Sequence, residues 1–220
     1  MRGASFFTYG REPGRIGRGP ALAAFVAVLL LAAGLRLYTV FSESLSGDEI
    51  FQRNIAAQPY FQQPSLIRGD IHPPLYYWLT KASASVFGYG VFGLRLPALV
   101  FGWLTVLLTM VLALRLFCDV RLALAAGLLV SLSDIQIVFS HFARSYAFLS
   151  ALVLAYILVL DLALRKSERR SSWLTLTGLS ILMAYTHYFA WLFIAAIAPA
   201  VLFHKNRRAR WRWVLTAAVA

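Results

Sequence analysis

The sequence predicts an all-α fold, a polytopic transmembrane helix bundle with a helical first extracytoplasmic loop. Of the 220 residues, 60% are hydrophobic and only 14% are charged, whereas an average soluble domain has roughly 25% charged residues. Several apolar stretches reach about 20 residues, enough to cross a hydrocarbon core about 30 Å thick. The basic residues gather beside these stretches, as they do in the cytoplasmic loops of membrane proteins.

The net charge of +12 raises the question of nucleic-acid binding. The positions of the basic residues argue against it. They form four clusters that each flank an apolar stretch, as expected for cytoplasmic loops that face anionic lipid. We therefore expect membrane lipid, and no nucleic acid, as a partner. The clusters are 2–18, Arg115 with Arg121, 165–170 and 205–212.

The chain divides into a basic segment, 1–19, expected to be disordered and cytoplasmic, and a transmembrane domain, 20–220. A longer apolar stretch, 173–203, has basic residues at both ends, so two short helices hinged near 186–190 would keep both ends inside. The last apolar stretch starts after Trp211 and stops at residue 220, so we expect the chain to be part of a longer protein. Single spans are expected at 20–41, 96–117, 122–139 and 146–164.

With the N-terminus inside, every basic cluster falls on the cytoplasmic side and 42–95 forms an extracytoplasmic loop. This loop is the only long polar region, and it contains four acidic and four basic residues. A helix is predicted to start at the proline pair Pro73 and Pro74. Its first aromatic residues, Tyr76, Tyr77 and Trp78, are expected at the membrane interface. Chemistry is therefore expected in this loop.

Asp48 and Glu49 lie side by side after the first span, and two interpretations are open. Acids in the first turn of a helix complement its dipole, and Ser46 could cap that helix. Alternatively, a carboxylate at the membrane surface can act as a general base. Adjacent residues on a helix point about 100° apart, so the two acids would have different tasks.

His72 precedes two prolines and is therefore held in an extended conformation. It either forms an ordinary turn before a helix or serves as a rigidly placed donor near the acids. Histidine and carboxylates can bind a divalent metal ion, but no spacing here matches a metal signature. We therefore expect no metal and no other cofactor.

Three cations of the outer side are candidates for binding a phosphate group. Arg144 is the first candidate, because guanidinium groups suit phosphate; its other interpretation is an interfacial arginine that reaches the headgroups. Arg95 and Lys81 are further candidates. His187 falls on the same outer face if 173–203 is a hairpin, either as a structural residue or as part of the site.

Four motifs together resemble the GT-C glycosyltransferases, and more narrowly the protein O-mannosyltransferase-like branch that includes the aminoarabinose lipid A transferases. The resemblance covers roughly residues 20–205 and implies a GT-C-like fold. The motifs are SGDE at 46–49, HPPLYYWL at 72–79, LRLPALVFGWLTVLLTMVLALRLF at 94–117 and FARSYAFLSALVLAY at 142–156.

The resemblance implies transfer of a sugar from a polyprenyl-phosphate-linked donor to an extracytoplasmic acceptor, with inversion at the anomeric carbon. The acceptor is a glycan, a lipid or a protein of the cell envelope, and the location is the bacterial cytoplasmic membrane. Asp48 takes the place of the family's catalytic carboxylate, with Glu49 as its companion. The residues matched to substrate binding are His72, Arg144, Tyr146 and His187.

Two alternatives to this enzyme remain open. One is a non-catalytic membrane subunit, in which the acids only cap a helix. The other is a transporter of a lipid-linked substrate, which favours ionisable residues in mid-membrane and an internal repeat. Asp134 is the only clear acid within a span, and no repeat is visible. Family members are usually longer, which leaves open whether these 220 residues are active alone.

Overall fold

The computed structural model describes residues 18–38, 40–70, 72–165 and 169–219. These ranges contain eleven helices and no strand, which confirms the all-α prediction. The expected disordered segment 1–19 lies outside the described residues, except that Arg18 already begins the first helix. The helices are α1 (Arg18–Tyr38), α2 (Gly47–Ala57), α3 (Gln63–Leu66), α4 (Leu75–Phe87), α5 (Val91–Phe117), α6 (Val120–Leu132), α7 (Asp134–His141), α8 (Tyr146–Arg165), α9 (Arg170–Ala184), α10 (Phe189–Leu202) and α11 (Arg207–Val219).

Helices α1, α5 and α8 are each long and apolar enough to cross a membrane. Helices α6 and α7 make a fourth span if the pair is counted as one, because it is bent by 58°. The sequence predicted these four spans but treated the third as one continuous helix. The break comes at Ser133, which has an extended conformation and precedes Asp134 at the start of α7. Serine before an acid is a favoured helix start, so a new helix begins there.

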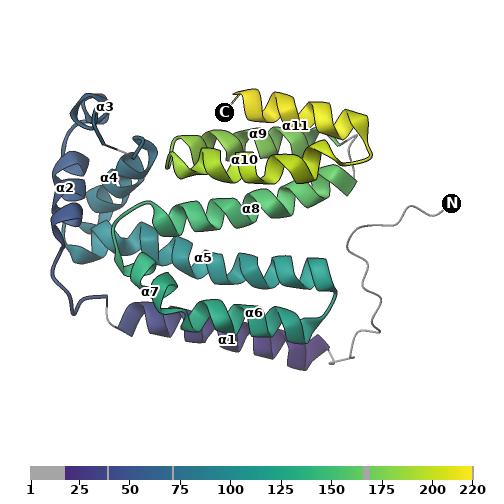
Figure 1. The fold of residues 1–220 in the computed structure, drawn as a ribbon. Coiled ribbons are helices and arrows are strands. Elements are labelled where there is room, and N and C mark those ends of the chain that lie inside the picture. Colours follow the sequence, from purple (N-terminus) through teal and green to yellow (C-terminus); the bar gives the residue numbers. More distant parts are fainter. Residues whose placement is uncertain (1–17, 39, 71, 166–168, 220) are drawn as a thin grey trace.

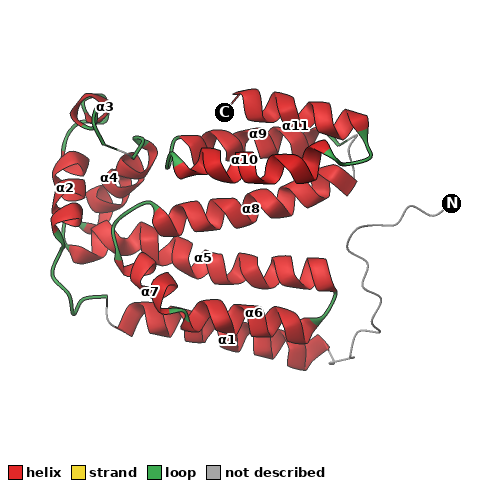
Figure 2. Cartoon of the chain, in the orientation of Figure 1, coloured by secondary structure: helices red, strands yellow, loops and turns green. Residues whose placement is uncertain are grey.

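The apolar stretch after the fourth span forms two short helices, α9 and α10, as the hairpin prediction required. The turn between them covers 185–188, at the expected hinge. Figure 2 shows that the connections between helices are short in most of the molecule. The hairpin packs beside α8, and its turn points back toward α4, where the backbone N–H of Leu75 donates to the carbonyl of Tyr185 at 3.2 Å.

The two ends of the bundle differ in composition. Figure 1 shows α2, α3 and α4 at one end, together with the α7–α8 connection and the α9–α10 turn. The start of α1 and the α5–α6, α8–α9 and α10–α11 connections lie at the opposite end, which carries the basic clusters. There Asp161 accepts from Arg115 at 2.6 Å and from Arg165 at 2.7 Å. The arrangement agrees with the topology derived from charge.

Helices α1, α5 and α7 cross closely near the first end of the bundle. Arg36 of α1 is buried, and its Nε donates to Ser140 Oγ of α7 at 3.1 Å. Gly102 of α5 lies beside this contact, because a Cβ built on it would be 3.2 Å from Arg36 Nε. The crossing fixes α7, and with it the 142–145 connection that leads into α8.

Candidate active site

The segments that carry the residues singled out by the sequence come together at the end of the bundle with α2 and α4 (Figure 1). Four segments contribute: the first turn of α2, residues 70–77 at the start of α4, the 142–146 connection, and the α9–α10 turn. They are far apart in the sequence, and polar contacts between them hold the arrangement.

Helix α2 begins with a capping box. Ser46 Oγ accepts from the backbone N–H of Glu49 at 3.3 Å, and Glu49 Oε2 accepts from the backbone N–H of Ser46 at 3.0 Å. The capping interpretation of the acidic pair is therefore confirmed for Glu49. Because this places Glu49 in the third helical position, its side chain turns inward and is 1% exposed.

Glu49 also fastens α2 to two other segments. Its Oε1 accepts from Arg95 Nε at 2.8 Å and from the backbone N–H of Ala143 at 2.9 Å, while its Oε2 accepts from Arg95 Nη2 at 2.9 Å. Burial opposes the ionisation of Glu49, but the hydrogen bonds from Arg95, Ala143 and Ser46 outweigh it, and the pKa of Glu49 lies below its ordinary value. Both oxygens are occupied, so Glu49 works as a cross-link.

Arg95 and Lys81, matched by the sequence to substrate binding, have partners inside the protein. Arg95 is 2% exposed. Besides Glu49, it donates to three carbonyls in the α1–α2 connection, the closest that of Val40 at 2.7 Å. Lys81 Nζ donates to the carbonyl of Ala56 at 3.2 Å and lies 5.3 Å from the ring centroid of Tyr60. In this structure both cations position α2.

The side chain of Asp48 points to the surface, unlike that of Glu49. Its side chain is 59% exposed, and its Oδ2 lies 3.5 Å from Arg144 Nη2. Adjacent helical residues differ by about 100° in direction, so one acid reaches the interior while the other stays at the surface. Asp48 is therefore a solvent-accessible carboxylate next to the guanidinium group of Arg144.

Arg144 is held mainly by the α4 side of the site. It is 7% exposed, so it lies within the protein and does not extend into the headgroups. Its Nη1 donates to the hydroxyl of Tyr77 at 3.2 Å and lies 3.8 Å from Asp70 Oδ2. Its Nε has no hydrogen-bond partner among the described residues. Arg144 thus lies between two carboxylates, Asp48 and Asp70.

Asp70 and Tyr77 are members of the site that the sequence analysis missed. Asp70 accepts from the hydroxyl of Tyr77, from the ring Nδ1 of His72 at 3.0 Å and from the backbone N–H of His72 at 3.3 Å. Burial opposes its ionisation, but the hydrogen bonds from Tyr77 and His72 and the electrostatic interactions with His72 and Arg144 keep its pKa below the ordinary value. The sequence did contain a signal for Asp70, because it lies two residues before His72 and so within reach of its ring.

The tyrosines expected at the membrane interface are inside the protein. Tyr76 is 1% exposed and Tyr77 is 0% exposed, so that prediction was wrong for both. Burial raises the pKa of Tyr77, and the hydrogen bond to Asp70 raises it further. Tyr77 therefore stays protonated and acts as a donor that links α4 to the Asp70–Arg144 pair.

His72, Tyr146 and His187 form an aromatic cluster behind Arg144. The rings of His72 and His187 lie 4.8 Å apart between centroids, and Tyr146 lies 6.1 Å from His72 and 6.0 Å from His187. Burial lowers the pKa of His187, and the electrostatic interaction with His72 lowers it further, against a smaller opposite effect of Asp70. His187 is therefore neutral near pH 7.

Both histidines are nearly inaccessible, with exposed fractions of 4% for His72 and 2% for His187. His187 Nδ1 accepts from the backbone N–H of Phe189 at 3.1 Å. Within the part of the chain that the structure describes, Nε2 of each ring has no partner. A buried polar group without a hydrogen bond costs about 1–3 kcal/mol, so each Nε2 is suited to bind a further polar group.

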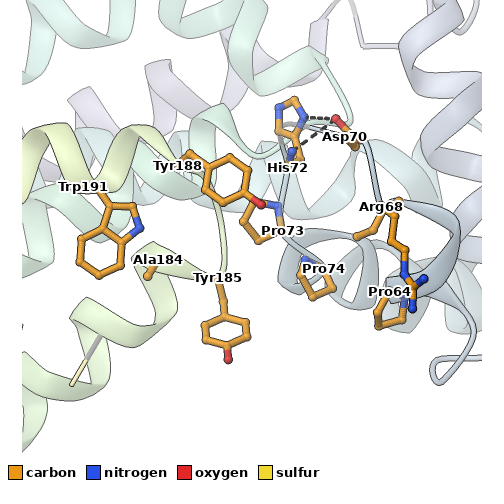
Figure 3. A pocket seen from close by; sticks show the side chains of 11 residues that line it. Pro64, Arg68, Asp70, His72, Pro73, Pro74, Ala184, Tyr185, Tyr188 and Trp191 are labelled. Atoms are coloured by element: carbon orange, nitrogen blue, oxygen red, sulfur yellow. Dashed lines mark hydrogen bonds and ion pairs between the residues drawn. The ribbon is translucent and has the colours of Figure 1, made fainter. Parts of the chain in front are cut away.

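A pocket of about 400 Å³ opens beside His72. Figure 3 shows its two walls, one from the 64–74 segment and one from the α9–α10 turn. Asp48 and Arg144 do not line it and connect to it through Asp70. In the described ranges no group of three or more His, Cys, Asp or Glu could hold a metal ion. The lining residues are Pro64, Ile67, Arg68, Asp70, His72, Pro73, Pro74, Ala184, Tyr185, Tyr188 and Trp191.

Comparison with known proteins identifies the relatives of this chain. Residues 71–220 match the family of dolichyl-phosphate-mannose-protein mannosyltransferases. Two proteins named undecaprenyl phosphate-α-4-amino-4-deoxy-L-arabinose arabinosyl transferase, from Pseudomonas paraeruginosa and Pseudomonas aeruginosa, are each 32% identical to it over 176 residues, 78% of this chain. The chain spans 30% of the length of these relatives. No solved structure matches it. The family match covers more than half of the sequence, and the chain therefore belongs to the dolichyl-phosphate-mannose-protein mannosyltransferase family.

Proposed function

We propose that the protein is an integral-membrane glycosyltransferase that transfers a sugar from a polyprenyl-phosphate donor to an extracytoplasmic acceptor with inversion. Membership of the family and the similarity to arabinosyl transferases named for an undecaprenyl phosphate sugar support this class of reaction. The observation that carries the proposal is the Asp48–Arg144 pair. An exposed carboxylate lies 3.5 Å from an arginine that Tyr77 and Asp70 hold in place.

Asp48 is the general base in this mechanism. The acceptor hydroxyl oxygen attacks the anomeric carbon on the face opposite the phosphate, and Asp48 takes the hydroxyl proton. The bond between the anomeric carbon and the phosphate oxygen breaks, and polyprenyl phosphate leaves with the electron pair. A positioned base contributes about 10²–10⁴-fold to such a step. Glu49 supports Asp48 by fixing the first turn of α2.

Arg144 binds the donor phosphate and stabilises the charge that develops on it. In this structure Arg144 already touches Asp48 at 3.5 Å and Asp70 at 3.8 Å. Asp48 is the exposed partner, so an arriving phosphate would displace it more easily than it would displace Asp70. Donor binding thus frees Asp48 from its cation and leaves it beside the anomeric carbon as a base.

The location and the acceptor follow from the same reasoning. The undecaprenyl phosphate sugar in the names of the relatives and the apolar spans of this chain support a location in the bacterial cytoplasmic membrane, with α2–α4 on the outer side. A glycan, a lipid or a protein that carries a hydroxyl at that surface is the acceptor.

The test is donor cleavage by the full-length protein in lipid nanodiscs, with a cell-envelope extract present to supply the acceptor hydroxyl. Undecaprenyl phosphate-α-4-amino-4-deoxy-L-arabinose and a polyprenyl phosphate mannose are the two donors, and release of the bare lipid phosphate is measured. We expect release from one of them by the wild type, and a loss of about 10²–10³-fold in Arg144→Gln. Arg165→Gln, at the opposite end of the bundle, is the matched control and should retain the wild-type rate.

The same experiment separates the alternatives. A transporter would move the intact donor between leaflets without releasing lipid phosphate. A non-catalytic subunit would neither move the donor nor release lipid phosphate, so Arg144→Gln and the wild type would give the same result. Either result contradicts the proposed enzyme.

A further inference from the structure

The hydrogen bond between His72 and Asp70 determines where the proton lies on a neutral His72 ring. Asp70 Oδ1 accepts at 3.0 Å, so Nδ1 of His72 carries the hydrogen that it donates. The other ring nitrogen, Nε2, is then a hydrogen-bond acceptor. Figure 3 shows the two bonds from His72 to Asp70, with the rest of the ring turned away from the carboxylate.

His187 has the opposite arrangement. Its Nδ1 accepts from the backbone N–H of Phe189 at 3.1 Å, and so it carries no hydrogen. In the neutral ring the hydrogen is therefore on Nε2, which is a donor. The two rings lie edge to face with centroids 4.8 Å apart.

The pair therefore offers one acceptor and one donor, both buried and both without a partner among residues 18–38, 40–70, 72–165 and 169–219. A hydroxyl group needs this combination, because it donates one hydrogen and accepts another. An anion would need two donors, and an ammonium group would need two acceptors. The chemistry of the pair is therefore that of a hydroxyl site.

The pocket beside His72 has room for the molecule that carries this hydroxyl. Its volume of about 400 Å³ falls in the range of small-ligand sites. Tyr185, Tyr188 and Trp191 line one wall, and Figure 3 shows them across from the proline pair. Aromatic surfaces with a few placed polar groups are typical of sites that bind a ring-shaped organic ligand. A monosaccharide combines a ring with several hydroxyls.

We propose that this pocket holds the sugar of the donor, with one sugar hydroxyl donating to His72 Nε2 and accepting from His187 Nε2–H. The inference rests on the proposed function, because it takes Arg144 as the residue that binds the donor phosphate. Arg144 lies 3.8 Å from Asp70, which lines the pocket and binds His72. A sugar attached to that phosphate therefore lies next to the histidine pair.

The test compares two lipids that differ only in the sugar. The affinity of the full-length protein in nanodiscs is measured for the sugar-linked undecaprenyl phosphate that the wild type cleaves and for bare undecaprenyl phosphate. In His187→Asn the amide oxygen can still accept from Phe189, but the Nε2 donor is gone. We expect this variant to bind the sugar-linked lipid about tenfold more weakly, with unchanged affinity for the bare lipid. His187→Gln, which can place an N–H near the lost donor, should restore part of the difference.

His204 provides the matched control, since its Nδ1 likewise accepts from a backbone N–H two residues on, that of Asn206 at 3.2 Å. His204→Asn should change neither affinity. Equal weakening of both lipids in His187→Asn, or weakening of neither, would overturn the sugar site and leave the proposed transferase standing. A wild type that binds neither lipid would contradict the proposed function itself, and the sugar site with it.

Discussion

Asp48 and Glu49 are neighbours in the sequence and yet have different surroundings. The capping box turns Glu49 inward, where Arg95 and the backbone of Ala143 occupy its oxygens. Asp48, one position earlier, stays at the surface next to Arg144. The helix rotation of about 100° per residue is enough to separate a structural acid from an accessible one. This separation supports Asp48 as the proposed base.

The two acids should respond differently to neutralisation. Glu49→Gln leaves Arg95 buried without its carboxylate, so we expect a loss of about 3–5 kcal/mol in the free energy of unfolding. Asp48→Asn removes an exposed, long ion pair and should change it by no more than about 1 kcal/mol. Thermal unfolding in detergent measures both.

Arg95→Met in the Glu49→Gln background serves as the control for this comparison. It removes the unpaired charge and should recover part of the lost stability. Equal stability of Glu49→Gln and Asp48→Asn would mean that the buried cross-link does not hold α2.

The sequence predicted which residues belong to the site better than it predicted the contacts between them. Asp48, His72, Arg144 and His187 could be selected from charge, motif order and topology. Asp70 was missed although it lies two residues before His72, because its contact with Arg144 depends on how the 142–146 connection packs against α4. That packing joins segments far apart in the sequence, and no local sequence pattern indicates it.

Among the elements, α1, α5 and α7 form the crossing that sets the position of the 142–145 connection. Arg36 and Ser140 form a buried hydrogen bond across it. A Cβ at Gly102 would overlap Ser140 Oγ and lie 2.8 Å from Ser140 Cβ. Glycine therefore permits the helices to approach, and the approach aligns Arg144 with α4.

Gly102→Ala should force α5 and α7 apart and destabilise the bundle by about 1–3 kcal/mol, as overpacking does. It should also weaken donor cleavage, because Arg144 follows α7. Thermal unfolding and the cleavage assay are the two measurements. Gly34→Ala is the matched control in α1, since nothing lies within 4 Å of a Cβ there. Wild-type stability and cleavage in Gly102→Ala would show that the crossing has no such role.

The sequence also predicted the membrane spans correctly, but it did not predict the bend between α6 and α7. Length and composition identify an apolar span directly, since about 20 apolar residues suffice. The 58° bend at Ser133 was missed because α6 and α7 together are apolar enough to be counted as a single span. Ser133 followed by Asp134 was the local signal of a new helix start. The hinge at 185–188 was found because the basic residues at both ends of the hairpin constrained it.

For the molecule as a whole, three groups of the site, Glu49, Asp70 and His187, make stability depend on pH. Glu49 and Asp70 have lowered pKa values in the folded state, so the stability they contribute is present above their ordinary pKa values and lost as pH falls. His187 also has a lowered pKa in the folded state. Below its ordinary pKa the unfolded chain binds a proton that the folded chain does not, so stability again falls with pH.

The midpoint of thermal unfolding should therefore decrease as pH falls below about 6.5 and decrease more steeply below about 4.3, the ordinary pKa values of histidine and glutamate. His187→Asn should make the decrease below about pH 6.5 shallower and leave the steeper decrease below about pH 4.3 unchanged. A series of unfolding curves between about pH 4 and 7.5 tests this. A midpoint that rises as the pH falls would contradict the assignment.

The central claim, that Asp48 is the general base of a sugar transfer, is tested most directly by the single-turnover transfer rate of Asp48→Asn in the full-length protein, with donor affinity measured in parallel. We predict a loss of about 10²–10⁴-fold in the rate, while the donor still binds, because Arg144 and not Asp48 binds its phosphate. Transfer at the wild-type rate in Asp48→Asn would contradict the account.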